Sequence, residues 1–368
     1  MKISIGSKIV EGPWGGGNLF VKNLSNYLKR NGHRVIYDLS EPDIDLILLT
    51  DPRSRKESSS SFNHIEINKY KEYVNKNVKV IQRINECDER KGTENINNFY
   101  LEASNSADHV VFVSSWLEKI YLNLGMDENK TSVILSGSNT EIFNPVNSDY
   151  LDTQTPVKLL THHWSSHRNK GFEIYKLIDD LIVTNKWKDK LEFTYIGNIS
   201  PEYKFYNSNI LKPLAGEELA SEIKRHHIYV TASINEPSGN HHIEAAQCGL
   251  PILYIESGGI PEYCKGFGVS FIDDFEKKLE LIISEYETHK QGMEKYPFNS
   301  EKMCEEYFQL FNFLIRDNEF NSINSSYSLS GRAFIIKNKF LKIFRDQIYL
   351  NIKNRLSNFY RKKVKRDG

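Results

Sequence analysis

Short apolar runs alternate along this chain with longer segments in which apolar residues recur at helical spacing. Such runs, rich in Ile, Leu and Val and bounded by Gly, Asn or charged residues, are typical of buried β-strands. In the first part of the chain they occupy Lys2–Gly6, Arg34–Tyr37, Leu46–Leu49, Val78–Ile81, His109–Val113 and Ser132–Leu135. Because helical patterns separate several of these runs, we predict a parallel α/β sheet.

The same alternation restarts after a polar stretch, Val146–Thr155. Further strands are predicted at Val157–Thr161, Glu192–Ile196, Ile228–Thr231, Ile252–Ile255 and Val269–Phe271. A length of 368 residues is enough for two domains that each bury a core. We therefore predict two Rossmann-like domains, over residues 1–150 and 151–316, the second closed by a helix at Ser300–Ile315. They should face each other across a cleft at the carboxyl ends of both sheets.

The last part of the chain differs in composition from the rest. We predict an Asn- and Ser-rich linker over 317–330 and a basic, amphipathic helical tail over 331–368. From Arg332 to Gly368 there are twelve Lys or Arg against two acids. Such a tail either binds an anionic membrane surface or packs against another protein or the body of this one, and we favour the membrane. Its apolar residues recur every fourth position: Phe340, Phe344, Ile348, Ile352, Leu356 and Tyr360.

Composition narrows the class of protein further. Over the whole chain 48 basic and 48 acidic residues cancel, so no global field favours nucleic acid as a partner. The four cysteines lack the paired short spacing of a zinc ribbon or a dense disulfide framework. The chain starts with a strand-like segment rather than a signal peptide, and no run approaches the ~20 apolar residues that span a bilayer. We expect a cytoplasmic protein, peripheral on the cytoplasmic membrane face if its tail binds lipid.

The most informative polar residues are Glu236 and Glu244, which bracket a loop that turns into a helix. A helix start leaves backbone N–H groups free and suits a phosphate. A carboxylate beside a phosphate is unfavourable, whereas it readily accepts hydrogen bonds from the hydroxyls of a sugar or ribose attached to that phosphate. This arrangement is typical of a nucleotide-sugar site.

Other candidate residues lie at comparable strand-to-helix corners. Three glycines, Gly15–Gly17, would let backbone amides approach a ligand closely, and a flexible turn is the alternative interpretation. Arg168 and Lys170 could neutralise a diphosphate, or be two solvated cations beside a helix start. Gly258 and Gly259 permit close backbone approach at a further corner.

Three pairs of adjacent histidines raise the question of a metal site, because imidazole is a common ligand. Adjacent residues on a strand point to opposite faces, and no acidic triplet accompanies the pairs, so we expect no metal. His241 or His242, at the start of the helix, is a candidate donor contact instead.

Taken in order, these motifs resemble glycosyltransferase family 4, a retaining group with the GT-B fold, over roughly residues 1 to 315. The similarity is carried by the motifs Gly15–Gly17, Asn31-Gly-His33, Ala107–Ser114, Gly137…Phe143…Pro145, Lys170-Gly171, Glu236…Glu244, Cys248–Pro251 and Gly258–Glu262. The resemblance implies that Glu236 contacts hydroxyls of the donor sugar and that Glu244 takes the ribose. It implies that Lys170 binds the diphosphate, approached from the other domain by the glycine loop. Further donor contacts would come from Gly16, Gly17, Gly239, Asn240, His241 and Gly259.

Two positions depart from the family pattern. Ser165 stands where the family usually has an Arg, and Arg168 is a substitute. Asn85 stands where the family commonly has a His, and an amide cannot do acid–base chemistry. Asn85, Glu86 and Asp88 are therefore the candidates on the acceptor side.

We accordingly expect a retaining, metal-independent glycosyltransferase. It would move a sugar from a nucleotide diphosphate sugar to a hydroxyl of a glycan or lipid-linked acceptor. Three alternatives stay open: another GT-B enzyme, such as a nucleotide-sugar epimerase or an inverting transferase; a catalytically silent scaffold; and a nucleic-acid-binding role for the basic tail.

Overall fold

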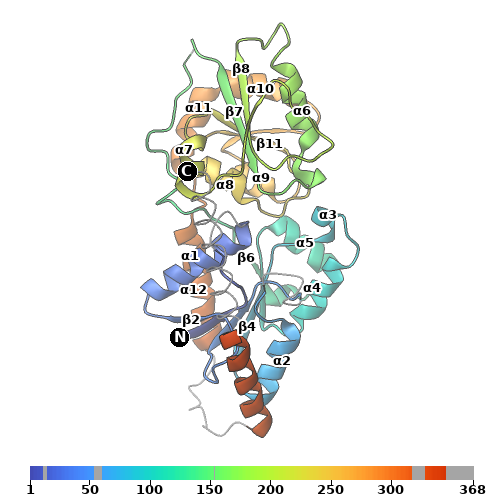
Figure 1. Ribbon diagram of the computed structural model, residues 1–368, viewed down its shortest axis with the longest axis vertical. Coiled ribbons are helices and arrows are strands. Elements are labelled where there is room, and N and C mark those ends of the chain that lie inside the picture. The colour runs from blue at the N-terminus through green and yellow to red at the C-terminus, as the bar shows by residue number, and fades with distance from the viewer. Residues whose placement is uncertain (11–14, 54–59, 153, 317–327, 345–368) are drawn as a thin grey trace, which may run out of the picture.

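The computed structural model describes residues 1–10, 15–53, 60–152, 154–316 and 328–344. Two α/β domains are stacked along the long axis of the molecule (Figure 1). Each contains a six-stranded sheet in which every strand pair is parallel. The predicted fold class is confirmed.

The first sheet has the strand order β2-β1-β3-β4-β5-β6. Its strands are β1 (Lys2–Ile5), β2 (Arg34–Ile36), β3 (Leu46–Leu49), β4 (Lys79–Ile84), β5 (His109–Phe112) and β6 (Thr131–Val133). The helices are α1 (Gly16–Arg30), α2 (His64–Tyr73), α3 (Asp88–Lys91), α4 (Ile96–Ser104) and α5 (Ser115–Asn123), with a 3₁₀ turn at Glu128–Lys130. All four residues of β3 are buried, as expected of a central strand covered on both faces.

The second sheet has the order β12-β11-β10-β7-β8-β9. Its strands are β7 (Val157–His163), β8 (Leu191–Gly197), β9 (Asn209–Leu211), β10 (Ile228–Thr231), β11 (Ile252–Ile255) and β12 (Gly268–Phe271). The helices are α6 (Phe172–Leu181), α7 (Gly216–Ile223), α8 (Asn240–Gln247), α9 (Ile260–Cys264), α10 (Phe275–Ser284) and α11 (Tyr286–Gly292), with 3₁₀ turns at Arg168–Lys170 and Met293–Lys295. The sequence prediction missed β9, a short edge strand whose side chains are largely exposed.

Helix α12 (Ser300–Arg316) follows the second domain in the chain but packs on the first. In Figure 1 it runs beside α1. The ring centroids of Phe20 on α1 and Tyr307 on α12 lie 5.1 Å apart, and Phe311 is fully buried in the same cluster. The sequence predicts this helix as part of the second domain because of its place in the chain, but its packing assigns it to the first.

Residues 329–344 form a helix on the first domain, near α2 (Figure 1). Ile335 is buried in the core around Tyr70, whereas Phe340 and Phe344 are 70% and 65% exposed. Packing against the body of the protein therefore accounts for one face of this helix. The predicted apolar positions beyond Phe344 and the basic end of the tail lie outside the described residues. No helix in the described ranges has the length and apolar character needed to cross a membrane.

The two domains touch through helix α9. Both carboxylate oxygens of Glu262 accept hydrogen bonds from the first backbone N–H groups of α5, those of Ser115 and Trp116, at 2.8 Å. The Tyr263 hydroxyl donates to the carbonyl of Val113 and accepts from the N–H of Ser136. The start of α5 thus donates to a side chain of the second domain in addition to its own cap, Ser114, so the two domains are in direct contact.

Candidate active site

A cavity of about 540 Å³ lies between the two domains. The glycine loop and the end of β4 contribute its lining from the first domain. The end of β7, the loop after β10 and the start of α8 contribute from the second. This is the location expected for ligands of doubly wound folds. It brings together most of the residues singled out in the sequence: Gly16, Gly17, Asn85, Lys170, Glu236, Gly239, Asn240, His241 and Glu244.

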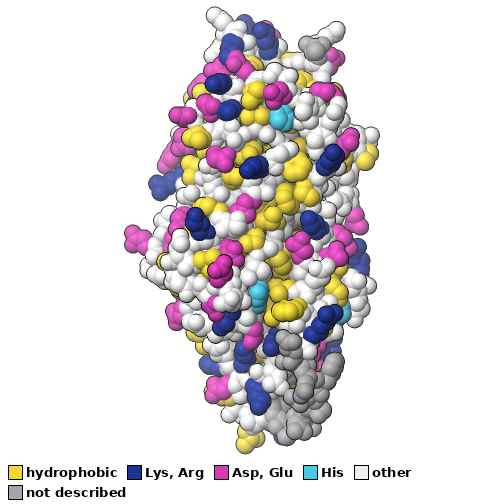
Figure 2. Space-filling model, turned by 180° about the vertical axis from the view of Figure 1, so that it is seen from behind, with side chains coloured by type: hydrophobic (Ala, Val, Ile, Leu, Met, Phe, Trp, Pro, Cys, Tyr) yellow, Lys and Arg dark blue, Asp and Glu magenta, His cyan; other side chains and the backbone are white. Residues whose placement is uncertain are grey.

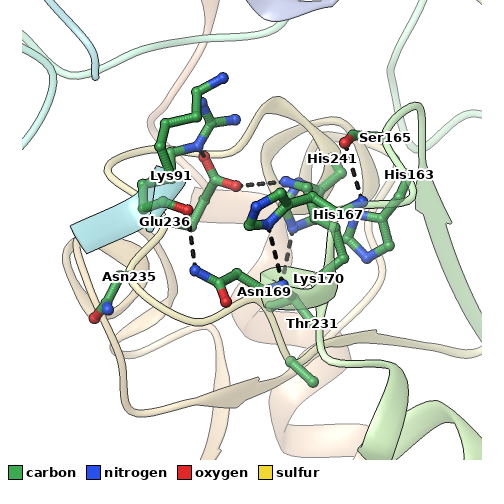
Figure 3. A network of polar contacts seen from close by, with 12 residues as sticks. Lys91, His163, Ser165, His167, Asn169, Lys170, Thr231, Asn235, Glu236 and His241 are labelled. Carbon is green, nitrogen blue, oxygen red and sulfur yellow. Dashed lines mark hydrogen bonds and ion pairs between the residues drawn. The ribbon is translucent and has the colours of Figure 1, made fainter. Parts of the chain in front are cut away.

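Glu236 lies at the centre of a network of charged side chains (Figure 3). Its Oε2 is 2.6 Å from Lys170 Nζ, and its Oε1 is 3.0 Å from Arg90 Nε. Burial alone would raise the pKa of the Glu236 carboxyl, but the charges of Arg90 and Lys170 outweigh it and hold the pKa well below its usual range. Burial lowers the pKa of Lys170, against the opposing effect of Glu236. Glu236 is therefore an ionised acceptor.

The loop that carries Glu236 packs directly against Gly258 and Gly259, the two glycines before α9. The N–H of Gly259 donates to the Glu236 carbonyl at 2.9 Å. A Cβ on Gly258 would come within 2.6 Å of that carbonyl oxygen, and one on Gly259 within 2.3 Å of the Pro237 oxygen. Gly259 does not line the cavity. Gly259 therefore does not make the expected contact with the sugar donor. Instead it supports the loop that carries Glu236, whose backbone fills the space left by the missing side chain.

Arg90 is the residue of this network that sequence reasoning missed. It comes from α3 in the first domain and crosses to Glu236 in the second. Glu86 accepts from Arg90 Nη1 with both oxygens at 3.0 Å, and Lys91 Nζ is 3.1 Å from Glu86 Oε2. The available signal was the spacing of Glu86 and Arg90, four residues apart, which is typical of an ion pair on a helix.

Glu244 lies on α8, and its Oε2 is 3.0 Å from Nε2 of His162 at the end of β7. Helix α8 begins after Gly239, whose φ of +92° is left-handed. A Cβ on Gly16 would come within 2.8 Å of the Asn240 side-chain oxygen. The glycine loop therefore lies directly against the start of α8, as the absence of side chains on the loop allows.

Four histidines pack around the start of α8: His162, His163, His241 and His242. Burial lowers the pKa of His163 and His241 well below the usual range and that of His242 to about 3, so these rings are neutral. His241 lines the cavity with Nε2 2.9 Å from the Thr231 hydroxyl. In the described part of the chain, no group of three or more His, Cys, Asp or Glu could hold a metal ion.

Three other predicted residues lie away from the cavity. Arg168 is exposed at the start of a 3₁₀ turn, because residues two apart on such a turn point to different sides and only Lys170 faces inward. The Asp88 carboxylate accepts from the backbone N–H groups of Ile96 and Asn97 at 2.9 Å, and so serves the start of α4. Glu86 is buried against Arg90 and Lys91, whereas Asn85 does line the cavity.

Comparison with protein families gave no match to any family model. Two curated proteins are similar to part of the chain. A probable sucrose-phosphate synthase of Thermosipho melanesiensis is 28% identical over 210 residues, 50% of this chain and 47% of that protein. The gpi3 subunit of a Schizosaccharomyces pombe phosphatidylinositol N-acetylglucosaminyltransferase is 24% identical over 208 residues, 51% of this chain and 44% of that protein. The matched regions thus span about half the length of these relatives.

Solved structures resemble the chain over most of its length. A sucrose-phosphate synthase from Thermosynechococcus elongatus superposes with a TM-score of 0.62 at 16% identity, covering 86% of this chain and 100% of that one. HepE of Anabaena, solved in complex with UDP and glucose, gives 0.60 at 13% identity, with 84% and 99% covered. A glycosyltransferase from Rickettsia africae gives 0.60 at 17% identity, with 86% and 99% covered. At these identities the likeness shows the fold: the chain has the GT-B architecture of two Rossmann-like domains facing across a cleft.

Proposed function

We propose that this protein is a retaining glycosyltransferase that moves a sugar from a nucleotide diphosphate sugar to a hydroxyl of a glycan or lipid-linked acceptor. The observation that carries the proposal is the ionised Glu236, held between Lys170 and Arg90 in the cavity between the domains. Support also comes from the similar proteins, two of which are named as a sucrose-phosphate synthase and an N-acetylglucosaminyltransferase subunit. UDP and glucose in the HepE structure support a nucleotide-sugar donor.

In this proposal the donor lies along the start of α8. The free N–H groups after Gly239 receive a phosphate, and Lys170 neutralises the charge that develops on the departing diphosphate. Glu236 accepts hydrogen bonds from hydroxyls of the transferred sugar. Oε2 of Glu244 contacts His162, which leaves Oε1 as the oxygen for the ribose hydroxyls.

The acceptor approaches from the first domain, where Asn85 lines the cavity. Its hydroxyl oxygen forms a bond to the anomeric carbon, while the bond from that carbon to the diphosphate oxygen breaks. Asn85 cannot accept the hydroxyl proton, so we assign that proton to the departing diphosphate. The domain contacts through Glu262 and Tyr263 would keep water from competing with the acceptor.

We further propose that the helix over 329–344 meets an anionic membrane surface, on which a lipid-linked acceptor would lie. The exposed side chains of Ile336, Phe340 and Phe344 offer apolar contact, and Lys337 and Lys339 add positive charge. The face seen in Figure 2 carries charges of both signs, interspersed with hydrophobic side chains. Sedimentation with vesicles of phosphatidylserine, but not with vesicles of phosphatidylcholine, is expected; binding to RNA instead would contradict the membrane role.

The donor is identified by thermal unfolding with UDP-, GDP-, ADP- and CMP-sugars, followed by turnover with the donor that stabilises the protein. Glu236→Ala is expected to abolish transfer while the variant stays folded. Undiminished transfer by Glu236→Ala would refute the catalytic assignment. An epimerised donor formed without any acceptor would support the epimerase alternative, and donor binding without transfer or hydrolysis would support the scaffold.

A further inference from the structure

We propose that Arg90 of the first domain binds the donor diphosphate together with Lys170. Arg90 would thereby supply, from across the cleft, the second cation that the phosphate corner of the second domain lacks. This inference rests on the proposed function, since it assumes a nucleoside diphosphate in the cavity.

The phosphate corner of the second domain is short of positive charge inside the cavity. Lys170 lines the cavity, but the neighbouring lining residue is the uncharged Ser165, and Arg168 is exposed outside it. A diphosphate carries more charge than one ammonium group can balance. Arg90 lines the same cavity and meets the same carboxylate as Lys170, so it is placed to provide the missing charge.

The ion pairs around Glu236 contain more cations than carboxylates. Three cations, Arg90, Lys91 and Lys170, share the two carboxylates Glu86 and Glu236, which leaves one positive charge in excess. Glu86, Glu236 and Lys170 are largely buried, with side-chain exposures of 8%, 8% and 11%, whereas the side chains of Arg90 and Lys91 are 27% and 39% exposed. The excess positive charge thus lies on partly exposed side chains, where an anionic ligand can pair with it.

Arg90 can exchange Glu236 for a phosphate without losing its own anchor. Both carboxylate oxygens of Glu86 accept hydrogen bonds from Arg90 Nη1, while Arg90 Nε forms the ion pair with Glu236. The Nη2 group makes neither of these contacts. A guanidinium fixed on one side by a carboxylate presents a rigid set of donors on the other, and such pre-ordered donors suit phosphate oxygens.

The position of Arg90 also depends on the second domain. The Asn169 side-chain amide donates to the backbone carbonyl of Arg90 at 3.0 Å, and that of Asn235 donates to the carbonyl of Glu89 at 3.2 Å. Asn169 precedes Lys170, and Asn235 precedes Glu236. Asn169 and Asn235, the neighbours of Lys170 and Glu236, therefore hold α3 against the second domain. This contact places Arg90 and Lys170 on either side of the Glu236 carboxylate.

The test separates a phosphate ligand from a contact that only closes the domains. Binding of UDP, GDP and ADP, and of the matching monophosphates, is measured by titration calorimetry on the full chain and on Arg90→Ala and Arg90→Lys. Arg30→Ala is the matched control, because Arg30 forms a 2.8 Å ion pair with Glu301 at the exposed surface, outside the cavity. Thermal unfolding of each variant reports whether it is folded.

We expect Arg90→Ala to weaken the nucleoside diphosphate about 10- to 100-fold, the worth of a hydrogen bond to a charged group, and the monophosphate less than about threefold. Arg90→Lys should fall between wild type and Arg90→Ala, and Arg30→Ala should bind both ligands like the wild type. Equal weakening of the two ligands would show a structural contact only and overturn the inference, as would an unchanged diphosphate affinity. In either case the proposed function stands; a wild-type protein that binds none of the three diphosphates refutes both.

Discussion

Removal of the Glu236 charge tests the electrostatics of the site directly. In Glu236→Gln, Lys170 and Arg90 keep hydrogen-bond partners but lose the negative charge between them. At separations of 2.6 and 3.0 Å, each pair attracts by roughly 6 kcal/mol at an effective dielectric constant of about 20. Much of this attraction is offset by the cost of taking the three groups out of water.

Buried ion pairs that lose one partner typically cost about 3–5 kcal/mol of the free energy of unfolding. We therefore expect the Glu236→Gln variant to unfold with a free energy lower by that amount, which corresponds to a midpoint about 6–20 °C lower for domains of this size. The measurement is urea unfolding at neutral pH without added anion, supported by calorimetry.

The matched control is Glu301→Gln, which weakens the ion pair with Arg30. That pair has a similar length, 2.8 Å, but its side chains are 60% and 62% exposed. An exposed pair contributes less than about 1 kcal/mol, so this variant should unfold much like the wild type. Equal and small effects of the two substitutions would refute the reasoning, because burial would then not have strengthened the Glu236 pairs.

Three further predictions concern stability and closure. The buried histidines have lowered pKa values, so the unfolded chain binds protons first and the free energy of unfolding falls as the pH drops below about 6.5. His242→Asn should remove about 2 kcal/mol of the difference in unfolding free energy between pH 7 and pH 5. Parallel pH profiles of stability for the variant and the wild type would contradict this. Glu262→Ala should cost about 0.5–2 kcal/mol, because the first two N–H groups of α5 lose their acceptor, and should increase the radius of gyration in small-angle scattering. An unchanged radius would mean that other contacts hold the domains together. Gly137→Ala should destabilise the protein by about 1–3 kcal/mol in urea unfolding, because its Cβ would lie 2.1 Å from the Asn299 backbone. Wild-type stability of this variant would show that the backbone at Asn299 moves aside at little cost.

The sheets could be predicted from the sequence because their strands are short apolar runs with helices between them. The edge strand β9 could not, because its side chains are largely exposed and so carry no apolar pattern. The packing of α12 on the first domain was equally hidden. Its apolar face indicates that it is buried but not against which sheet; its contacts with the first domain, such as that of Tyr307 with Phe20, answer that question.

The candidate site was predictable where its residues are neighbours in the chain. Glu236, Gly239 and Glu244 belong to one loop and one helix, so their common location follows from local geometry. Arg168 and Lys170 looked equivalent in the sequence. Both belong to one 3₁₀ turn, at whose start His167 accepts from the Asn169 N–H, and only Lys170 lines the cavity.

Arg90 illustrates what a single sequence does not contain. Its partner Glu236 lies in the other domain, and their contact exists only because α3 docks between Asn169 and Asn235. If Arg90 binds the diphosphate as proposed, the second cation reaches the leaving group only when the domains are closed. Domain closure would then complete the charge stabilisation and exclude water in the same movement, which would protect the donor from hydrolysis while the cleft is open.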